Sequence, residues 1–152
     1  GKTDKLILNQ SIDDFENISS KNINSFDVND FEINFLRGLD LEDGASTITD
    51  FTSIIIASNL SNVILKSNQK ISKVILCGGG RKNKTLIERI KKYTDNSIKF
   101  VSSEEYGVDG DFVESQAFGY IAIRSFLKLP ISFPKTTGCK SPTTGGVYVK
   151  NF

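Results

Sequence analysis

Apolar and polar positions follow one another in a pattern that predicts helices and strands in turn. Apolar residues recur near the helical period over 41–66, which predicts the longest helix. Residues 74–77 (Val-Ile-Leu-Cys) form a short apolar run, typical of a strand covered on both faces. A helix over 85–93, a half-covered strand over 98–101 and a helix over 112–127 follow. This alternation indicates an α/β fold with parallel strands.

Polar side chains near the helix starts are the expected caps. Asp43 or Ser46 is expected to cap the helix over 41–66, and Asp111 the helix over 112–127. Asp50 sits early in the first of these helices, where the dipole favours an acid. The inward positions expected in the long helix are Ile48, Phe51, Ile55, Leu60 (or Asn59), Val63 and Ile64. In the helix over 85–93 we expect Leu86, Ile87 and Ile90 inward, with Glu88, Arg89, Lys91 and Lys92 facing solvent.

The two ends of the chain are predicted to be less regular. Residues 1–40 are expected to be a polar linker or anchoring segment, and residues 41–152 the lobe that follows it. Residues 6–8 form a strand or a helical turn, and residues 9–25 are expected to be loop because their Asn, Asp and Ser side chains compete with backbone ladders. The tail holds all three prolines and is expected to be extended, ending in a strand over 147–149. One face of an amphipathic turn is shared by Phe31, Phe35 and Leu36.

Three consecutive glycines, Gly78–Gly80, join the strand over 74–77 to the helix that begins near Thr85. Glycine lacks a Cβ, so its backbone can lie flat against a ligand, and a helix N-terminus adds donors for an anion. Asn83, or Lys82 before it, opens the helix, and Asn83 serves either as the N-cap or as a side-chain amide for the ligand. The spacing matches neither the dinucleotide fingerprint of oxidoreductases nor the phosphate loop of nucleoside triphosphatases. The bend is therefore either a ligand-binding surface or a plain turn.

The composition of the chain excludes several classes of binding partner and catalytic site. The formal net charge is +1, which gives no broad field for nucleic acid or an anionic membrane. No His is present, which excludes Ser-His-Asp and Cys-His catalysis within this chain, and two Cys make no disulfide framework or metal set. No apolar run approaches the length of a membrane-spanning helix. Cys77 is expected to be a small core residue. Because two strands make a small sheet and Met is absent, we expect a piece of a longer protein, with the sheet completed elsewhere.

Three stretches, in this order and spacing, resemble the C-terminal half of anhydro-N-acetylmuramic acid kinases. They are Leu76–Asn83, Ser102–Asp109 and Phe112–Gly119. The tail fits the same family ending through Thr137-Gly138-Cys139 and Gly145-Gly146-Val147-Tyr148. A weaker resemblance further upstream covers residues 21–31.

The resemblance implies an α/β fold that is the C-terminal lobe of an actin-like ATPase, a ribonuclease H-like fold with an incomplete sheet and flanking helices. It implies a two-lobed kinase that phosphorylates 1,6-anhydro-N-acetylmuramic acid with hydrolytic ring opening. The product is N-acetylmuramic acid 6-phosphate, in peptidoglycan recycling in the bacterial cytoplasm. The implied cofactors are ATP and Mg, the latter held through the missing half.

By the same resemblance, the nucleotide is lined by Gly78, Gly79, Gly80 and Asn83. Glu114 is the candidate for the sugar, with Glu105 a weaker one, although a first-turn acid is also explained by the helix dipole. The family's phosphate-binding segment and catalytic aspartate have no counterpart here, and residues 40–44 (Asp-Leu-Glu-Asp-Gly) do not replace the first. No catalytic residue is therefore assigned in this chain.

We expect this chain to be inactive alone, with an N-terminal half as a separate chain and a homodimer as candidate partners, and no nucleic-acid or membrane partner. The alternative is a catalytically dead gene remnant or a stand-alone nucleotide-binding module. A dinucleotide-binding subdomain is disfavoured by the glycine spacing.

Overall fold

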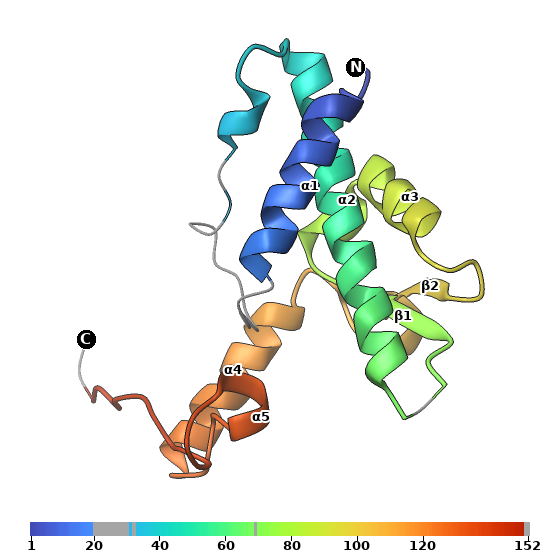
Figure 1. Ribbon diagram of the computed structural model, residues 1–152. Coiled ribbons are helices and arrows are strands. Elements are labelled where there is room, and N and C mark those ends of the chain that lie inside the picture. The colour runs from blue at the N-terminus through green and yellow to red at the C-terminus, as the bar shows by residue number, and fades with distance from the viewer. Residues whose placement is uncertain (20–30, 32, 69, 151–152) are drawn as a thin grey trace. The chain divides into compact units, whose positions relative to one another are not determined.

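The computed structural model describes residues 1–19, 31, 33–68 and 70–150 (Figure 1). The predicted sequence block over 21–31 lies outside the described residues except for Phe31. Five α-helices and two strands are present in the described residues: α1 (Lys5–Ser19), α2 (Leu41–Lys66), β1 (Lys73–Leu76), α3 (Lys84–Tyr93), β2 (Lys99–Ser102), α4 (Val113–Phe126) and α5 (Pro134–Thr137).

The chain divides into two compact units, and the backbone passes from the first to the second, back to the first and again to the second. The first comprises Gly1–Leu76 and Gly80–Val101, and the second comprises Cys77–Gly79 and Ser102–Phe152. The predicted division into residues 1–40 and 41–152 stays a prediction.

Helix α1 replaces the loop that was expected after residue 8, for the part of that segment that is described. Asp4 starts it, because its Oδ1 accepts hydrogen bonds from the backbone N–H groups of Leu6 and Ile7, each at 3.0 Å. Leu8 and Phe15 share one helical face and form a core with Phe51 of α2. The loop prediction was wrong because this apolar spacing is interrupted by polar residues that favour turns in isolation. Tertiary packing on α2 stabilises the helix.

Helix α2 has the predicted bounds, and its side chains contradict two expectations. Asp40, not Asp43 or Ser46, is the N-cap and accepts from the backbone N–H of Asp43 at 2.8 Å. The buried face is mostly small or polar, because Ala57 and Ser53 allow close helix packing, while the predicted inward Val63 is 60% exposed. The buried residues of α2 are Gly44, Ser46, Thr47, Asp50, Phe51, Ser53 and Ala57.

The same helix corrects the expectation that no segment is long enough to span a membrane. Among the described residues, Leu41–Lys66 alone is long and apolar enough to cross one, by length and composition only. A polar residue of this helix contacts α3, because Asp50 forms an ion pair with Arg89 at 3.3 Å (Oδ2 to Nη1). Arg89, expected to face solvent, also donates to the carbonyl oxygen of Ser46 at 2.6 Å. In Figure 1, α2 lies between α1 and α3, and it contacts both helices.

Strands β1 and β2 pair in parallel as a two-stranded sheet. The connection between them contains α3, whose inward Ile90 is 4% exposed, as predicted. Val101 of β2 is also buried, at 3% exposed. The expectation that β1 is covered on both faces is wrong for this chain, because Ile75 is 53% exposed.

The second unit is built around α4 and the segment that follows it. The N-cap of α4 is Phe112, which makes no side-chain cap bond, so the expected cap at Asp111 was wrong. The tail is less extended than predicted, because it contains α5 and an isolated antiparallel bridge between Ser132 and Thr143. The strand expected over 147–149 does not form in the structure.

Candidate glycine bend and acidic loop

The glycine bend changes the backbone direction at the carboxyl end of β1. Gly78 has φ +76°, a left-handed conformation that favours glycine. A 3₁₀ turn, Gly79–Lys82, follows and leads directly into α3. Asn83 caps α3, since its Oδ1 accepts from the backbone N–H of Leu86 at 3.1 Å. Of the alternatives left open by the sequence, the structure shows Asn83 and not Lys82 as the N-cap. A contribution of Asn83 to a ligand would come from its Nδ2 amide.

The backbone of this bend faces open space. A Cβ built on Gly78 or Gly79 would meet no described heavy atom within 4 Å, neighbours in the chain aside, and one on Gly80 would only touch Leu86 Cδ2 at 4.0 Å. The bend is therefore not filled by the described side chains. Gly79 has no left-handed φ, so neither strain nor crowding requires a glycine at that position. A ligand that lies against the main chain is one physical reason for it.

The loop that follows β2 is fastened to the same bend. The backbone N–H of Gly78 donates to the carbonyl oxygen of Gly110 at 2.8 Å. Glu104 holds the other side of Gly110, because its Oε1 accepts from the Gly110 backbone N–H at 3.2 Å. The other carboxylate oxygen of Glu104 accepts from the hydroxyls of Ser102 and Ser103. The segment that follows β1 and the loop that follows β2 are thus joined by a hydrogen bond within the second unit.

The two acids expected near the sugar take different places. Glu105 is exposed in a 3₁₀ helix, Ser103–Tyr106, and its Oε1 accepts from the backbone N–H of Ser102 at 3.4 Å. Glu114 is exposed in the first turn of α4, as expected, six residues after Val108. Gly78, Gly79, Glu105 and Glu114 belong to the second unit, and Gly80 and Asn83 belong to the first.

Sequence reasoning missed Glu104, whose carboxylate organises the loop through three hydrogen-bond partners. Its signal was the pattern Glu104-x-x-Gly107-x-Asp109-Gly110, which is typical of a tight, folded loop. Gly107 takes φ +72° and Asp109 Oδ1 accepts from the backbone N–H of Asp111 at 2.9 Å. The carboxylate of Glu104 is therefore a support for the loop, and its own oxygens already have donors.

The cysteines and acids supply no metal centre in the described part of the chain. No group of three or more His, Cys, Asp or Glu is placed there to hold a metal ion. Cys77 is exposed and lies just after the end of β1, so its expected place in the core was wrong. Hydrogen bonding, chiefly from the Thr137 hydroxyl, lowers the pKa of Cys139.

Comparison with known proteins places these features in one family. Residues 24–151 match the family described as anhydro-N-acetylmuramic acid kinase. The chain is 52% identical to the protein of that name from Pelagibacter ubique over 152 residues, which is all of this chain and 40% of the relative. It is 40% identical to the one from Caulobacter vibrioides and 39% identical to the one from Zymomonas mobilis, each over 108 residues, 71% of this chain and 28% of the relative. The chain thus spans less than half the length of these relatives.

Proposed function

The chain belongs to the anhydro-N-acetylmuramic acid kinase family, and we propose that it is the part of such a kinase that holds ATP and sugar from one side. The rest of the active site comes from polypeptide outside this chain, because the chain spans only 40% of its relative from Pelagibacter ubique. The observation that carries the proposal is the open main chain at Gly78–Gly80, whose first glycine is hydrogen-bonded to Gly110 of the acidic loop.

The nucleotide is assigned to the glycine bend. Gly79 and Gly80 offer bare backbone, and the start of α3 adds a helix N-terminus with its partial positive charge. The N–H of Gly78 is already bonded to Gly110, so it shapes the bend and does not donate to phosphate. Asn83 can add its Nδ2 amide while its Oδ1 keeps the cap. These groups suit the adenosine and α-phosphate side of ATP.

The sugar is assigned to Glu114, with Glu105 as a second candidate. Glu114 is exposed at the start of α4, immediately after the loop that is tied to the bend. Its carboxylate can accept hydrogen bonds from sugar hydroxyl or amide groups. Glu105 is weaker because its carboxylate already accepts a bond from Ser102 within its own turn.

The reaction transfers the γ-phosphoryl group of ATP to O6 of 1,6-anhydro-N-acetylmuramic acid. Water adds to C1 as the bond between C1 and O6 breaks, so that ATP, sugar and water give ADP and N-acetylmuramic acid 6-phosphate. Mg, when bound, neutralises charge on the phosphates. Because the described residues offer no cluster for a metal, we assign Mg and the base that activates water to the remainder of the kinase. The setting is peptidoglycan recycling in the bacterial cytoplasm.

The test is reconstitution. This chain is mixed with a polypeptide carrying the part of the Pelagibacter ubique kinase that it does not align with, and ADP release is followed with ATP, Mg and the anhydro sugar. We expect turnover in the mixture and none with either polypeptide alone. Folded components that form no active mixture would count against the proposal. ATP binding by this chain alone, without turnover in any mixture, would favour a stand-alone nucleotide-binding module instead.

A further inference from the structure

Helix α4 carries apolar side chains on every side, with polar residues between them, yet none of its residues is buried. At about 3.6 residues per turn, the apolar side chains of α4 point in every direction from the helix axis. A helix of this kind belongs inside a protein and not on a surface. The exposed fractions are 63% for Phe118, 60% for Tyr120, 61% for Ile123 and 62% for Phe126.

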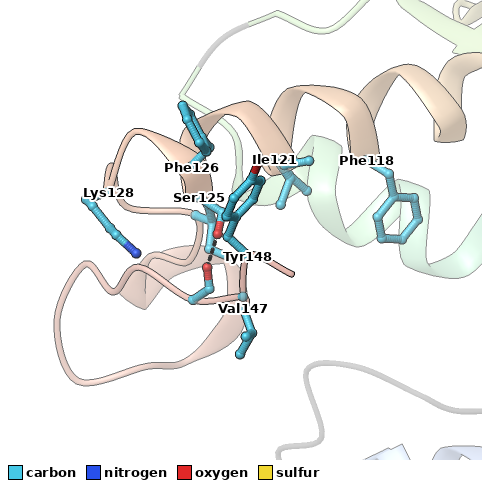
Figure 2. A pocket seen from close by; sticks show the side chains of 11 residues that line it. Phe118, Ile121, Ser125, Phe126, Lys128, Val147 and Tyr148 are labelled. Atoms are coloured by element: carbon cyan, nitrogen blue, oxygen red, sulfur yellow. Dashed lines mark hydrogen bonds between the residues drawn. The ribbon is translucent and has the colours of Figure 1, made fainter. Parts of the chain in front are cut away.

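The tail folds back along one side of α4 and leaves a groove there (Figure 2). The Ser125 hydroxyl donates to the carbonyl oxygen of Gly145, and the rings of Phe126 and Tyr148 lie 5.4 Å apart. The groove has a volume of about 460 Å³. We define it by Phe118, Ile121, Phe126, Lys128, Val147 and Tyr148.

The lining suits an apolar protein surface better than a polar small molecule. Ser125 is already hydrogen-bonded to Gly145, and most other lining side chains are aliphatic or aromatic. Val147 is 90% exposed and Tyr148 is 64% exposed, so the rim is as apolar as the floor. A contiguous apolar patch of this kind marks an interaction site.

The basic residues near the C-terminus indicate the charge that a partner of this groove should carry. The segment over 115–152 contains no Asp or Glu, and its basic residues are Arg124, Lys128, Lys135, Lys140 and Lys150. The whole chain carries only +1, so the positive charge is concentrated in this segment. Lys128 lines the groove, and the other four basic residues lie elsewhere in the same segment. An apolar surface flanked by acidic residues is complementary to such a segment.

From these observations we infer that the groove between α4 and the tail docks the part of the kinase that this chain does not span. The occupant is a polypeptide surface, apolar and flanked by acidic residues, from the larger portion of the relative outside the 40% that aligns. This inference rests on the proposed function for the identity of the partner, and names the surface through which the two parts meet.

The experiment measures association and needs no ATP. The complementary polypeptide from the Pelagibacter ubique kinase is titrated into this chain, and the dissociation constant is obtained by sedimentation velocity. We compare wild type with Phe118→Asp and Val147→Asp, and use Leu65→Asp on α2 as the matched control, because Leu65 is also an exposed apolar residue, at 82%. All three positions are exposed, so circular dichroism should show unchanged folding.

We expect a one-to-one complex that weakens at least tenfold with Phe118→Asp and Val147→Asp, that is unchanged with Leu65→Asp, and that weakens as salt is raised. Equal affinity in all variants would overturn the inference. So would a homodimer of this chain that the same substitutions abolish, or binding to phosphatidylglycerol vesicles lost in the same way. If the complementary polypeptide does not fold alone, the two parts are fused into one polypeptide. Amide hydrogen exchange in α4 should then be slower in the fusion than in this chain alone, and equal rates would overturn the inference.

The two proposals fail separately. A complex that depends on Phe118 and Val147 but does not turn over would sink the kinase proposal and leave the docking surface. An active mixture whose association is insensitive to both substitutions would support the kinase proposal and overturn the docking surface.

Discussion

Helices α2 and α4 are both rich in apolar residues, but only α2 has residues that are buried by other segments of this chain. In α2 seven residues are buried, and most of them are small or polar; in α4 none is buried. Apolar character therefore did not decide which helix is covered. Close packing decided it, because Ala57, Ser53 and Thr47 let the neighbouring helices approach α2 and bring hydrogen-bond partners for its polar groups.

The difference also separates two kinds of polar group. Asp50, 9% exposed, is satisfied by Arg89 at 3.3 Å, by the Tyr93 hydroxyl at 3.2 Å and by the Thr3 hydroxyl. This network is complete within its unit, so its explanation is structural. Glu114 is exposed in the first turn of α4, where the helix dipole favours an acid, and its assignment to the sugar is a proposal. We call the first unit closed, because the polar groups of Asp50 are paired within it, and the second unit open, because no residue of its helix α4 is buried.

The strongest test of the closed unit removes the cation from the network. Arg89→Met should destabilise the first unit by about 2–4 kcal/mol, because it leaves the partly buried Asp50 carboxylate without its cation and the Ser46 carbonyl without the donor from Arg89. Urea unfolding followed by circular dichroism measures this change. Lys84→Met, at an exposed position of α3, should stay within about 0.5 kcal/mol of wild type. Equal effects of the two substitutions would contradict the account.

The open unit depends on the tail keeping its place along α4. Gly146 has φ +86°, and a Cβ there would lie 2.6 Å from Ser125 Oγ. Gly146→Ala should therefore cost about 1–3 kcal/mol and release the tail, seen as faster amide exchange over residues 143–148. Gly145→Ala is the matched control, since its Cβ would approach only the flexible end of Ile131, at 3.3 Å. Unchanged exchange in Gly146→Ala would show that the tail does not depend on this contact.

A smaller effect should appear with pH in the closed unit. Burial, and then the charge of Asp50, raise the pKa of Tyr93 above its usual value near 10.0. The folded state therefore holds the phenolic proton more tightly, and this stabilisation is complete below pH 10 and is lost as pH rises through the folded pKa. Tyr93→Phe should lose less stability than wild type between about pH 9 and 11. Parallel pH profiles of the two proteins would contradict this.

Sequence patterns located elements better than they located contacts. The bounds of α2, the parallel pairing of β1 with β2 and the N-cap at Asn83 follow from apolar periodicity, element order and capping chemistry. Helix α1 was missed because its stability comes from packing on α2. The pairing of Arg89 with Asp50, 39 positions away in the chain, leaves no local signal. For the same reason Gly110 could not be placed beside Gly78 before the fold was known.

The glycine bend was predictable as a stretch of bare backbone, whereas its role in binding stays a prediction. Consecutive glycines after a strand indicated where backbone is bare, and the structure leaves room there. Glu104 and Glu105 are adjacent in the sequence, and only their hydrogen bonds separate the residue that supports the loop from a neighbour with one bond to its own turn. The assignments of Gly78–Gly80, Asn83, Glu105 and Glu114 to nucleotide and sugar stay predictions.

The most direct measurement is the affinity for ATP with a single methyl group added to the bend. Calorimetry compares wild type with Gly79→Ala and with Gly44→Ala, each in complex with the complementary part of the kinase. Gly79 has room for a Cβ and an ordinary φ, and Gly44 sits in α2 with only Leu39 Cβ near, at 3.9 Å, so both variants should fold. We predict that Gly79→Ala weakens ATP binding by about tenfold or more and that Gly44→Ala does not. Equal affinity for ATP in all three proteins would contradict a nucleotide resting on the glycine backbone.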